Sequence, residues 1–200
     1  MSSTSAPFGM RPAYHPSGLD RANALSNGIP IVSTSGNNNL GYATNILKGQ
    51  PVKMTTNGTL NVAAAGDAFL GCFAGVEWTD TTGRRRISNY WPASESFQTG
   101  SVVAYYYNDP NIVYEIQTDG TVDQTLIGAE CDLSNTTDGS TVTGLSQCTL
   151  SASPVAAGST AGMRVIALAP YADNAWGDNY VIVQAQIAEY QFAGVAGTAI

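Results

Sequence analysis

His15 is the only histidine in the chain and the first residue to consider for catalysis, because imidazole is the usual base near neutral pH. A catalytic base has to be positioned rigidly within hydrogen-bond reach of its nucleophile. His15 instead lies between Tyr14 and Pro16, in a stretch rich in Ser, Pro, Gly and Asn that predicts no regular support. We interpret His15 as a residue that packs with Tyr14 and predict no catalytic triad.

Carboxylates are the next candidates, since a pair of them can act as acid and base without histidine. Most aspartates lie beside Gly, Asn, Thr or Pro, which predicts turns. Glu77 and Glu115 fall within strand-like segments, where sheet alternation predicts that they face solvent. Asp132, Asn135 and Asp138 lack EF-hand spacing, and no Gly-x-x-x-x-Gly-Lys motif is present. We predict no catalytic residue, no metal and no cofactor, and hence no enzyme.

The three cysteines, Cys72, Cys131 and Cys148, are far apart in the sequence and form no Cys-x-x-Cys pair. This spacing argues against a disulfide framework and against zinc. Cys72 lies in a hydrophobic segment and is predicted to be a core thiol. Whether Cys131 and Cys148 pair with each other stays open at this stage.

A basic cluster, Arg84, Arg85 and Arg86, contains three of the eight basic residues of the chain and follows a predicted Asp-Thr-Thr-Gly turn. Consecutive strand residues alternate in direction, so at least one arginine is expected to point inward or toward a partner. One interpretation is a solvated hairpin whose arginines pair with local acids. The other is a docking contact, because the guanidinium group forms planar pairs with several donors at interfaces.

Consecutive tyrosines offer another possible site. Tyr105, Tyr106 and Tyr107, together with Trp176, supply large rings that suit protein interfaces or a stacking platform for sugars. Because a strand alternates its faces, either Tyr106 or the pair Tyr105 and Tyr107 is expected in the core.

The composition favours strands and loops over helices. Charged residues make up 12% of the chain, about half of the roughly 25% usual in soluble domains, while hydrophobic residues stand at 44%. Gly, Ser, Thr and Asn fill the difference, which favours many short strands joined by turns. We predict an all-β fold, with a single β-barrel or β-sandwich body and one core.

The charge and hydropathy patterns also exclude some partners. The net charge of −7 argues against nucleic acid, because phosphate binding needs clustered Lys and Arg. No stretch approaches the ~20 apolar residues that span a bilayer, and the start of the chain does not resemble a signal peptide. We expect no membrane partner and synthesis in a cytoplasm.

The chain is predicted to divide into three parts. Residues 1–40 lack periodicity and are predicted to form an extended N-terminal arm, whose apolar side chains some other surface must cover. Residues 41–193 form the β body, and residues 194–200 form a C-terminal tail.

Turn signals divide the body into strands. Asn57-Gly58 predicts a hairpin between residues 52–55 and 60–63. An Asn-Asp-Pro-Asn sequence predicts a second hairpin between residues 102–107 and 112–117.

The most hydrophobic segment, residues 69–78, is placed at the centre of the body. Gly71 and Gly75 within it predict a bulge or a close approach to another backbone. Residues 163–169 and 180–187 are the last predicted strands, and the second of them alternates as expected for a strand with one buried face.

Three stretches resemble small head proteins of tailed bacteriophages, usually called decoration, cement or capsid-stabilising proteins. They are SAPFGMRPAYHPSGLDRA from Ser5, ILKGQPV from Ile46 and GVEWTDTTGRRRISNYWPA from Gly75. The resemblance covers most of the chain in layout. Its most recognisable residues are Pro7, Phe8, Gly9, Arg11 and Pro12.

The resemblance implies a virion protein whose β body lies on the outside of an icosahedral head. The implied partners are the major capsid protein and copies of the chain itself, with a homotrimer favoured and a dimer possible. The expected contacts are Phe8, Met10, Arg11, Tyr14 and His15 in the arm, and Arg84, Arg85 and Arg86 in the body. The alternatives are a head–tail or tail-tube component and a carbohydrate-binding module displayed on the virion.

Overall fold

The structure is a computed structural model that describes residues 4–18, 25–29, 42–56, 58–156 and 158–193. The predicted tail, residues 1–3, 19–24 and 30–40 of the predicted arm, and residue 41 of the predicted body lie outside the described residues. Strands make up nearly all of the regular structure in the described part, beside one short 3-10 helix, η2 (Gln124–Leu126). The prediction of an all-β fold is therefore confirmed.

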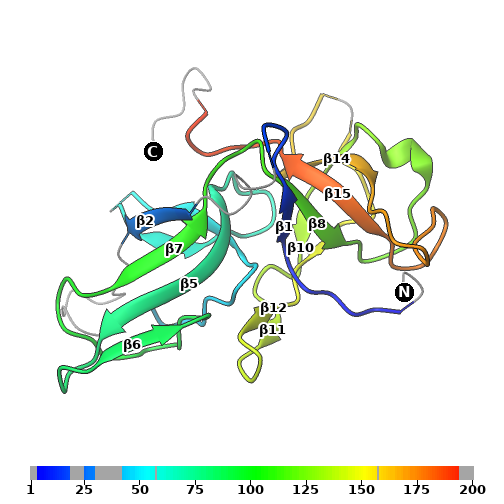
Figure 1. Ribbon diagram of the computed structural model, residues 1–200. Coiled ribbons are helices and arrows are strands. Elements are labelled where there is room, and N and C mark those ends of the chain that lie inside the picture. Colours follow the sequence, from blue (N-terminus) through cyan, green and yellow to red (C-terminus); the bar gives the residue numbers. More distant parts are fainter. Residues whose placement is uncertain (1–3, 19–24, 30–41, 57, 157, 194–200) are drawn as a thin grey trace.

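A five-stranded antiparallel sheet forms one side of the molecule (Figure 1). Its strands, in spatial order, are β1 (Arg11–Tyr14), β8 (Val113–Gln117), β15 (Ile182–Ile187), β14 (Met163–Leu168) and β9 (Glu130–Cys131). In β15, Val183, Ala185 and Ile187 are buried while Gln184 and Gln186 are only partly buried. The predicted alternation of this strand is confirmed.

A second antiparallel sheet, of six strands, forms the other side (Figure 1). Its strands are β2 (Leu25–Ile29), β7 (Val103–Tyr107), β5 (Gly71–Thr79), β3 (Pro51–Met54) and β4 (Leu60–Val62), with β6 (Arg85–Ser88) paired to the last part of β5. β5 is the central strand, as predicted for residues 69–78, and the predicted hairpin of β3 and β4 is confirmed. Both large sheets run between open edges, so the described strands form no closed barrel.

Two short strand pairs complete the regular structure of the described part. β10 (Leu133–Ser134) pairs with β13 (Thr149–Leu150), and β11 (Gly139–Ser140) pairs with β12 (Leu145–Ser146). The β11–β12 hairpin projects from the lower part of the molecule in Figure 1.

Gly71 and Gly75 have the roles that the sequence predicts. A Cβ atom at Gly71, where φ is +154°, would lie 1.5 Å from the carbonyl oxygen of Tyr107. Only a residue without a side chain permits this approach of β5 to β7. The register between β5 and β7 shifts between Phe73 and Gly75, which marks the predicted bulge.

The hairpin predicted between residues 102–107 and 112–117 is wrong. Both strands form, as β7 and β8, but β7 pairs with β5 and β2 whereas β8 pairs with β1 and β15. The turn between them, closed by the Ile112 N–H and the Asp109 carbonyl at 3.2 Å, carries the chain from one sheet to the other. β8 is buried along its whole length, and a two-stranded hairpin offers no such cover.

The described residues form two hydrophobic clusters instead of the single core that we predicted. The first lies mainly under the five-stranded sheet and includes Tyr114 and Ile116, and the second lies under the six-stranded sheet and includes Phe73 and Trp91. Tyr190 packs against both clusters. Each sheet has its own apolar face to bury, so one sequence of this length builds two adjoining cores.

The described start of the predicted arm belongs to the body. Residues 11–14 form β1, which pairs with β8, and the Met10 side chain is 2% exposed in the first cluster. The division of the chain at residue 40 is therefore corrected for residues 4–18. The Pro-rich composition excludes a helix, but Pro12 is compatible with the strand at the edge of a sheet, where β1 lies.

Candidate functional site

His15 is a structural residue in this fold. Its Nε2 lies 3.1 Å from Oδ2 of Asp109, and its Nδ1 accepts a hydrogen bond from the Ser17 N–H at 3.0 Å. Nδ1 is thus hydrogen-bonded, Nε2 lies near the Asp109 carboxylate without hydrogen-bond geometry, and the side chain is 5% exposed. Burial tends to raise the pKa of Asp109, but hydrogen bonds from Asn111 and the nearby His15 lower it overall. His15 thus links the end of β1 to the turn between the two sheets.

Arg11 is also engaged within the chain. Its guanidinium pairs with Oε2 of Glu115 at 2.5 Å, donates to the Tyr171 hydroxyl, and lies 4.6 Å from the centre of the Phe8 ring. The Tyr171 hydroxyl donates to the same Glu115 oxygen at 2.6 Å. Glu115 is only 8% exposed, so its predicted position on a solvent face is wrong. The positive charge of Arg11 balances that of the Glu115 carboxylate, and the Tyr171 hydroxyl adds a hydrogen bond to it.

The residues predicted as arm contacts therefore differ in how much of each side chain is exposed and able to touch a partner. Met10 is inside the core and His15 is buried, so in this conformation neither presents a contact surface. Phe8 and Tyr14 are partly buried, and half of the Arg11 side chain is exposed. The direct contacts proposed for Met10 and His15 are corrected to internal ones.

The hairpin that presents Arg84, Arg85 and Arg86 is organised by Asp80. Oδ1 of Asp80 accepts hydrogen bonds from the Thr82 N–H at 2.9 Å, the Thr82 hydroxyl at 2.6 Å and the Arg84 N–H at 2.9 Å. Its Oδ2 accepts one from Nε of Arg86 at 3.0 Å. The hydrogen bonds from Thr82, Arg84 and Arg86 hold the pKa of Asp80 well below its ordinary value. The turn is thus built around an ionised carboxylate.

The three arginines are all exposed, and two of them pair with local acids. Arg85 pairs with Glu77, whose pKa this hydrogen bond lowers, and Arg86 pairs with Asp80. Arg84 forms no ion pair with a described residue. The interpretation as locally paired arginines thus holds for Arg85 and Arg86, and Arg84 is the one with its guanidinium available.

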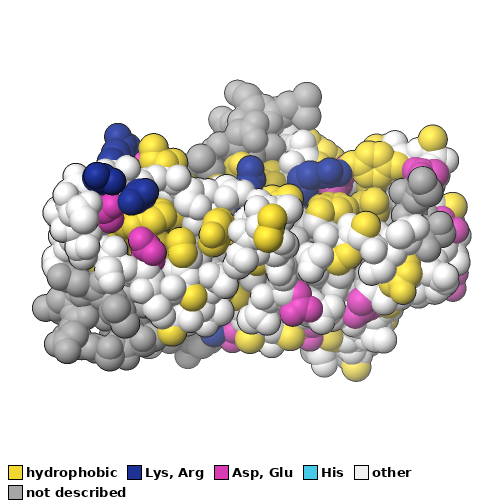
Figure 2. All heavy atoms as spheres, turned by 90° about the horizontal axis from the view of Figure 1, so that it is seen from below, with side chains coloured by type: hydrophobic (Ala, Val, Ile, Leu, Met, Phe, Trp, Pro, Cys, Tyr) yellow, Lys and Arg dark blue, Asp and Glu magenta, His cyan; other side chains and the backbone are white. Residues whose placement is uncertain are grey.

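An exposed hydrophobic side chain directly follows these arginines, and another lies on the hairpin next to the far end of β6. Ile87, the next residue of β6, is 75% exposed. The Asn89 side chain donates to the Thr143 carbonyl at 2.9 Å, which brings β6 next to the β11–β12 hairpin, where Val142 is 94% exposed. We call Arg84, Arg85 and Ile87 the β6 edge surface. One end of the face in Figure 2 shows basic, acidic and hydrophobic side chains gathered together.

The consecutive tyrosines occupy both faces of β7, as the alternation of a strand predicts. Tyr106 is buried in the second cluster, and Tyr107 and Trp176 pack partly buried against the first. Tyr105, on the opposite face of β7 from Tyr106, is partly buried and forms a hydrogen bond with Glu77. Tyr106 is therefore unavailable for contact, whereas Tyr105, Tyr107 and Trp176 keep only part of their surface exposed.

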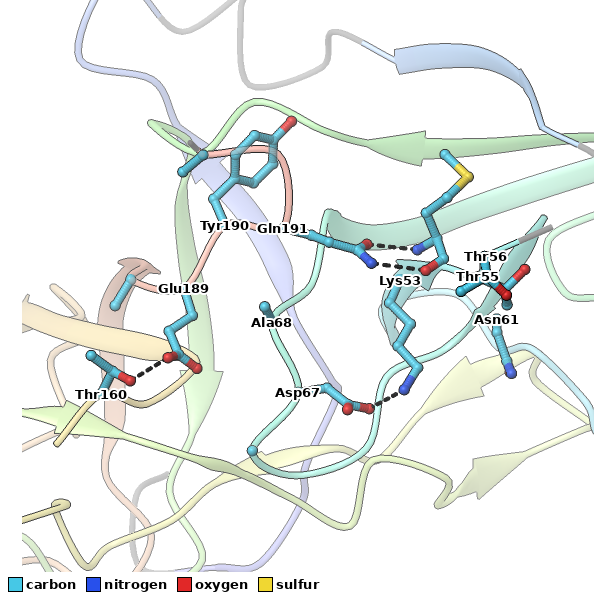
Figure 3. A pocket seen from close by; sticks show the side chains of 14 residues that line it. Lys53, Thr55, Thr56, Asn61, Asp67, Ala68, Thr160, Glu189, Tyr190 and Gln191 are labelled. Atoms are coloured by element: carbon cyan, nitrogen blue, oxygen red, sulfur yellow. Dashed lines mark hydrogen bonds and ion pairs between the residues drawn. The ribbon is translucent and has the colours of Figure 1, made fainter. Parts of the chain in front are cut away.

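A groove of about 870 Å³ lies between the β3–β4 hairpin and the segment after β15 (Figure 3). The charged and polar groups along it pair with each other: Lys53 with Asp67 at 2.5 Å, and Thr160 with Glu189. The Gln191 carboxamide bonds to the backbone of Met54. The groove thus runs along the line where the C-terminal segment is attached to the six-stranded sheet by the Gln191 hydrogen bonds.

The cysteines are free and buried, which confirms the prediction that Cys72 is a core thiol. Cys131 and Cys148 are not paired with each other. Burial raises the pKa of the Cys131 thiol to about 11 and that of Cys72 and Cys148 further, so none is a reactive thiolate near neutral pH.

Within the described residues, no group of three or more His, Cys, Asp or Glu side chains is placed to bind a metal ion. The same part of the chain contains no helix long and apolar enough to cross a membrane. No protein-family model, no curated protein and no solved structure matches the chain.

The roles of two residues at the β6 hairpin, Asp80 and Ile87, were missed in the sequence. Asp80 was assigned only to a turn, although an aspartate at the first position of a turn often accepts backbone N–H groups two and four residues later. Ile87 was assigned to a strand with no indication of which face it occupies, since a four-residue strand is too short to show alternation.

Proposed function

We propose that this chain is a non-enzymatic structural protein of a tailed-bacteriophage virion. Within that class, we propose a decoration protein that binds the outer surface of a mature icosahedral head and bridges subunits of the major capsid protein. The sequence resemblance suggests the class, and the surface chemistry of β6 supports a docking role.

The β6 edge surface is the observation that carries the proposal. It places Arg84, whose guanidinium has no ion-pair partner among the described residues, just before a short strand that carries a largely exposed isoleucine, in a chain whose net charge is −7. Arginine beside an apolar side chain is typical of the contacts that contribute most to protein interfaces. A single exposed hydrophobic side chain is common on protein surfaces, so Ile87, which is 75% exposed, supports the proposal only through its position beside the arginines.

Stabilisation would follow from mass action. A protein that binds the assembled shell but not its dissociated subunits shifts the equilibrium toward the shell. If copies of the chain associate, with a homotrimer favoured and a dimer possible, each further contact forms at a high effective concentration. Phe8, Arg11 and Tyr14 remain secondary candidate contacts, because they are at least partly exposed.

The test is co-sedimentation of the full chain with mature heads that lack their decoration protein, followed by electron microscopy of the pellet. We expect saturable binding at positions on the outer shell surface. Arg84→Glu should weaken binding at least about tenfold, because one buried interfacial contact is worth roughly 1.4 kcal/mol or more.

Arg164→Glu is the charge-matched control on the other sheet; it replaces the Arg164–Glu130 ion pair with two carboxylates on neighbouring strands, so its fold is first checked by circular dichroism. Its binding should equal that of the wild type. Absence of binding by the wild type would refute the proposal, and rings of the protein in micrographs would favour a head–tail or tail-tube component instead.

A further inference from the structure

β6 has an open edge. In the described part of the chain, its strand partner is β5, and no strand lies on its other side (Figure 1, lower left). The register pairs Thr79 with Arg85, Trp78 with Arg86 and Glu77 with Ile87. An edge of this kind presents unpaired backbone groups to solvent.

The hydrogen bonds of Thr79 decide which backbone groups these are. The Thr79 N–H donates to Oγ of Ser101 at 3.1 Å, and its carbonyl accepts from the Gln98 N–H at 2.8 Å. Both groups therefore point away from β6, and the pair of Thr79 and Arg85 is a non-hydrogen-bonded pair. Because such pairs alternate in an antiparallel ladder, Glu77 and Ile87 form the next one. The N–H and carbonyl groups of Arg85 and Ile87 thus face the open edge.

The charge of the side chains beside this edge indicates which charge a bound strand should carry. Arg84 and Arg85 are exposed next to Ile87, and Arg84 has no acidic partner among the described residues. A second copy that paired β6 with β6 in the register that sets Arg86 opposite Arg86 would bring like charges together across the strands, which is unfavourable. The edge therefore fits a strand that carries carboxylates.

We infer that β6 accepts an extended, carboxylate-bearing segment of the capsid subunit, which adds to the six-stranded sheet as a further strand. This inference rests on the proposed function and specifies its mode of binding. The backbone groups of Arg85 and Ile87 supply the ladder of hydrogen bonds, Arg84 pairs with a carboxylate, and Ile87 supplies an apolar contact.

The test compares two variants at one position, in the full chain with mature heads as the binding partner. Ile87→Ala removes the apolar side chain and keeps the outward N–H, whereas Ile87→Pro removes both. Proline is tolerated on an edge strand where its missing N–H would face solvent, so both variants should fold. We expect Ile87→Pro to bind at least tenfold more weakly than Ile87→Ala.

Hydrogen exchange of the wild-type chain provides a second measurement that needs no variant. The amides of Arg85 and Ile87 should exchange fast in the free protein and become protected on the heads.

Equal binding by the two variants, or unprotected amides in the bound state, would overturn strand addition while head binding itself stands. A self-associated species in ultracentrifugation that Ile87→Pro abolishes would also overturn it, in favour of a second copy. Failure of the wild type to bind heads would refute the proposed function instead.

Discussion

The side chain of Gln191 takes the place of a neighbouring strand for Met54. Its Oε1 accepts the Met54 N–H at 2.7 Å, and its Nε2 donates to the Met54 carbonyl at 2.8 Å. One carboxamide thus satisfies both backbone groups of a residue that lies beyond the part of β3 that pairs with β5. The C-terminal segment is thereby fastened to the six-stranded sheet, alongside the groove in Figure 3.

Gln191→Ala should therefore destabilise the fold by about 1–3 kcal/mol, because both Met54 groups lose their partners. Chemical denaturation monitored by circular dichroism measures this loss. Gln147→Ala, at an exposed position, is the control and should stay within about 0.5 kcal/mol of the wild type. Equal stability of the two variants would show that solvent replaces the Gln191 contacts without loss.

Met10 tests whether the start of the chain belongs to the body. Met10→Ala should cost about 2–5 kcal/mol of unfolding free energy, since the side chain is 2% exposed within the first cluster. Ile127→Ala, at a residue that is 45% exposed, should cost much less. If Met10→Ala unfolds like the wild type, residues 4–18 are an arm after all.

Gly71 should tolerate no side chain. Gly71→Ala places a methyl group 1.5 Å from the Tyr107 carbonyl oxygen, so β5 and β7 must separate. We expect a loss of more than about 4 kcal/mol or failure to fold, measured by thermal unfolding. Gly66→Ala is the control, because its Cβ would contact nothing within 4 Å and only its φ of +77° adds strain, about 1–2 kcal/mol. Similar melting temperatures for the two variants would contradict the close approach.

Asp80 should cause the free energy of unfolding to decrease as the pH becomes acidic. Its pKa is lower in the folded protein than the ordinary 3.8, so its contribution is fully present above that value and is lost as the pH falls through the lower folded value. Asp80→Asn should lower stability at neutral pH and flatten this acid-side decline. Asp123→Asn, at an exposed aspartate without a capping hydrogen bond, is the matched control. Melting curves between pH 2 and 7 would show the difference, and parallel profiles for Asp80→Asn and the wild type would contradict the role of the carboxylate.

Local patterns in the sequence were enough to predict the fold class and several elements. The composition predicted an all-β chain, Asn57-Gly58 predicted the β3–β4 hairpin, and the alternation of residues 181–187 predicted the buried face of β15. These predictions succeed because turn chemistry and side-chain alternation act between residues that are close in the sequence. The same holds for Gly71, whose lack of a side chain indicated a close backbone approach.

Only the tertiary structure decided which strands pair and which residues are free to bind. The sequence of a strand such as β8 does not show whether it pairs with β7 or with β1 and β15. β8 is buried on both faces, and that burial is available only in the five-stranded sheet. Residues 11–14 become a strand only because β8 offers an edge. Likewise, Arg85 and Arg86 are paired because β5 and its turn place Glu77 and Asp80 beside them, whereas Arg84 has no acidic partner among the described residues. No local sequence pattern contains this relation between side chains.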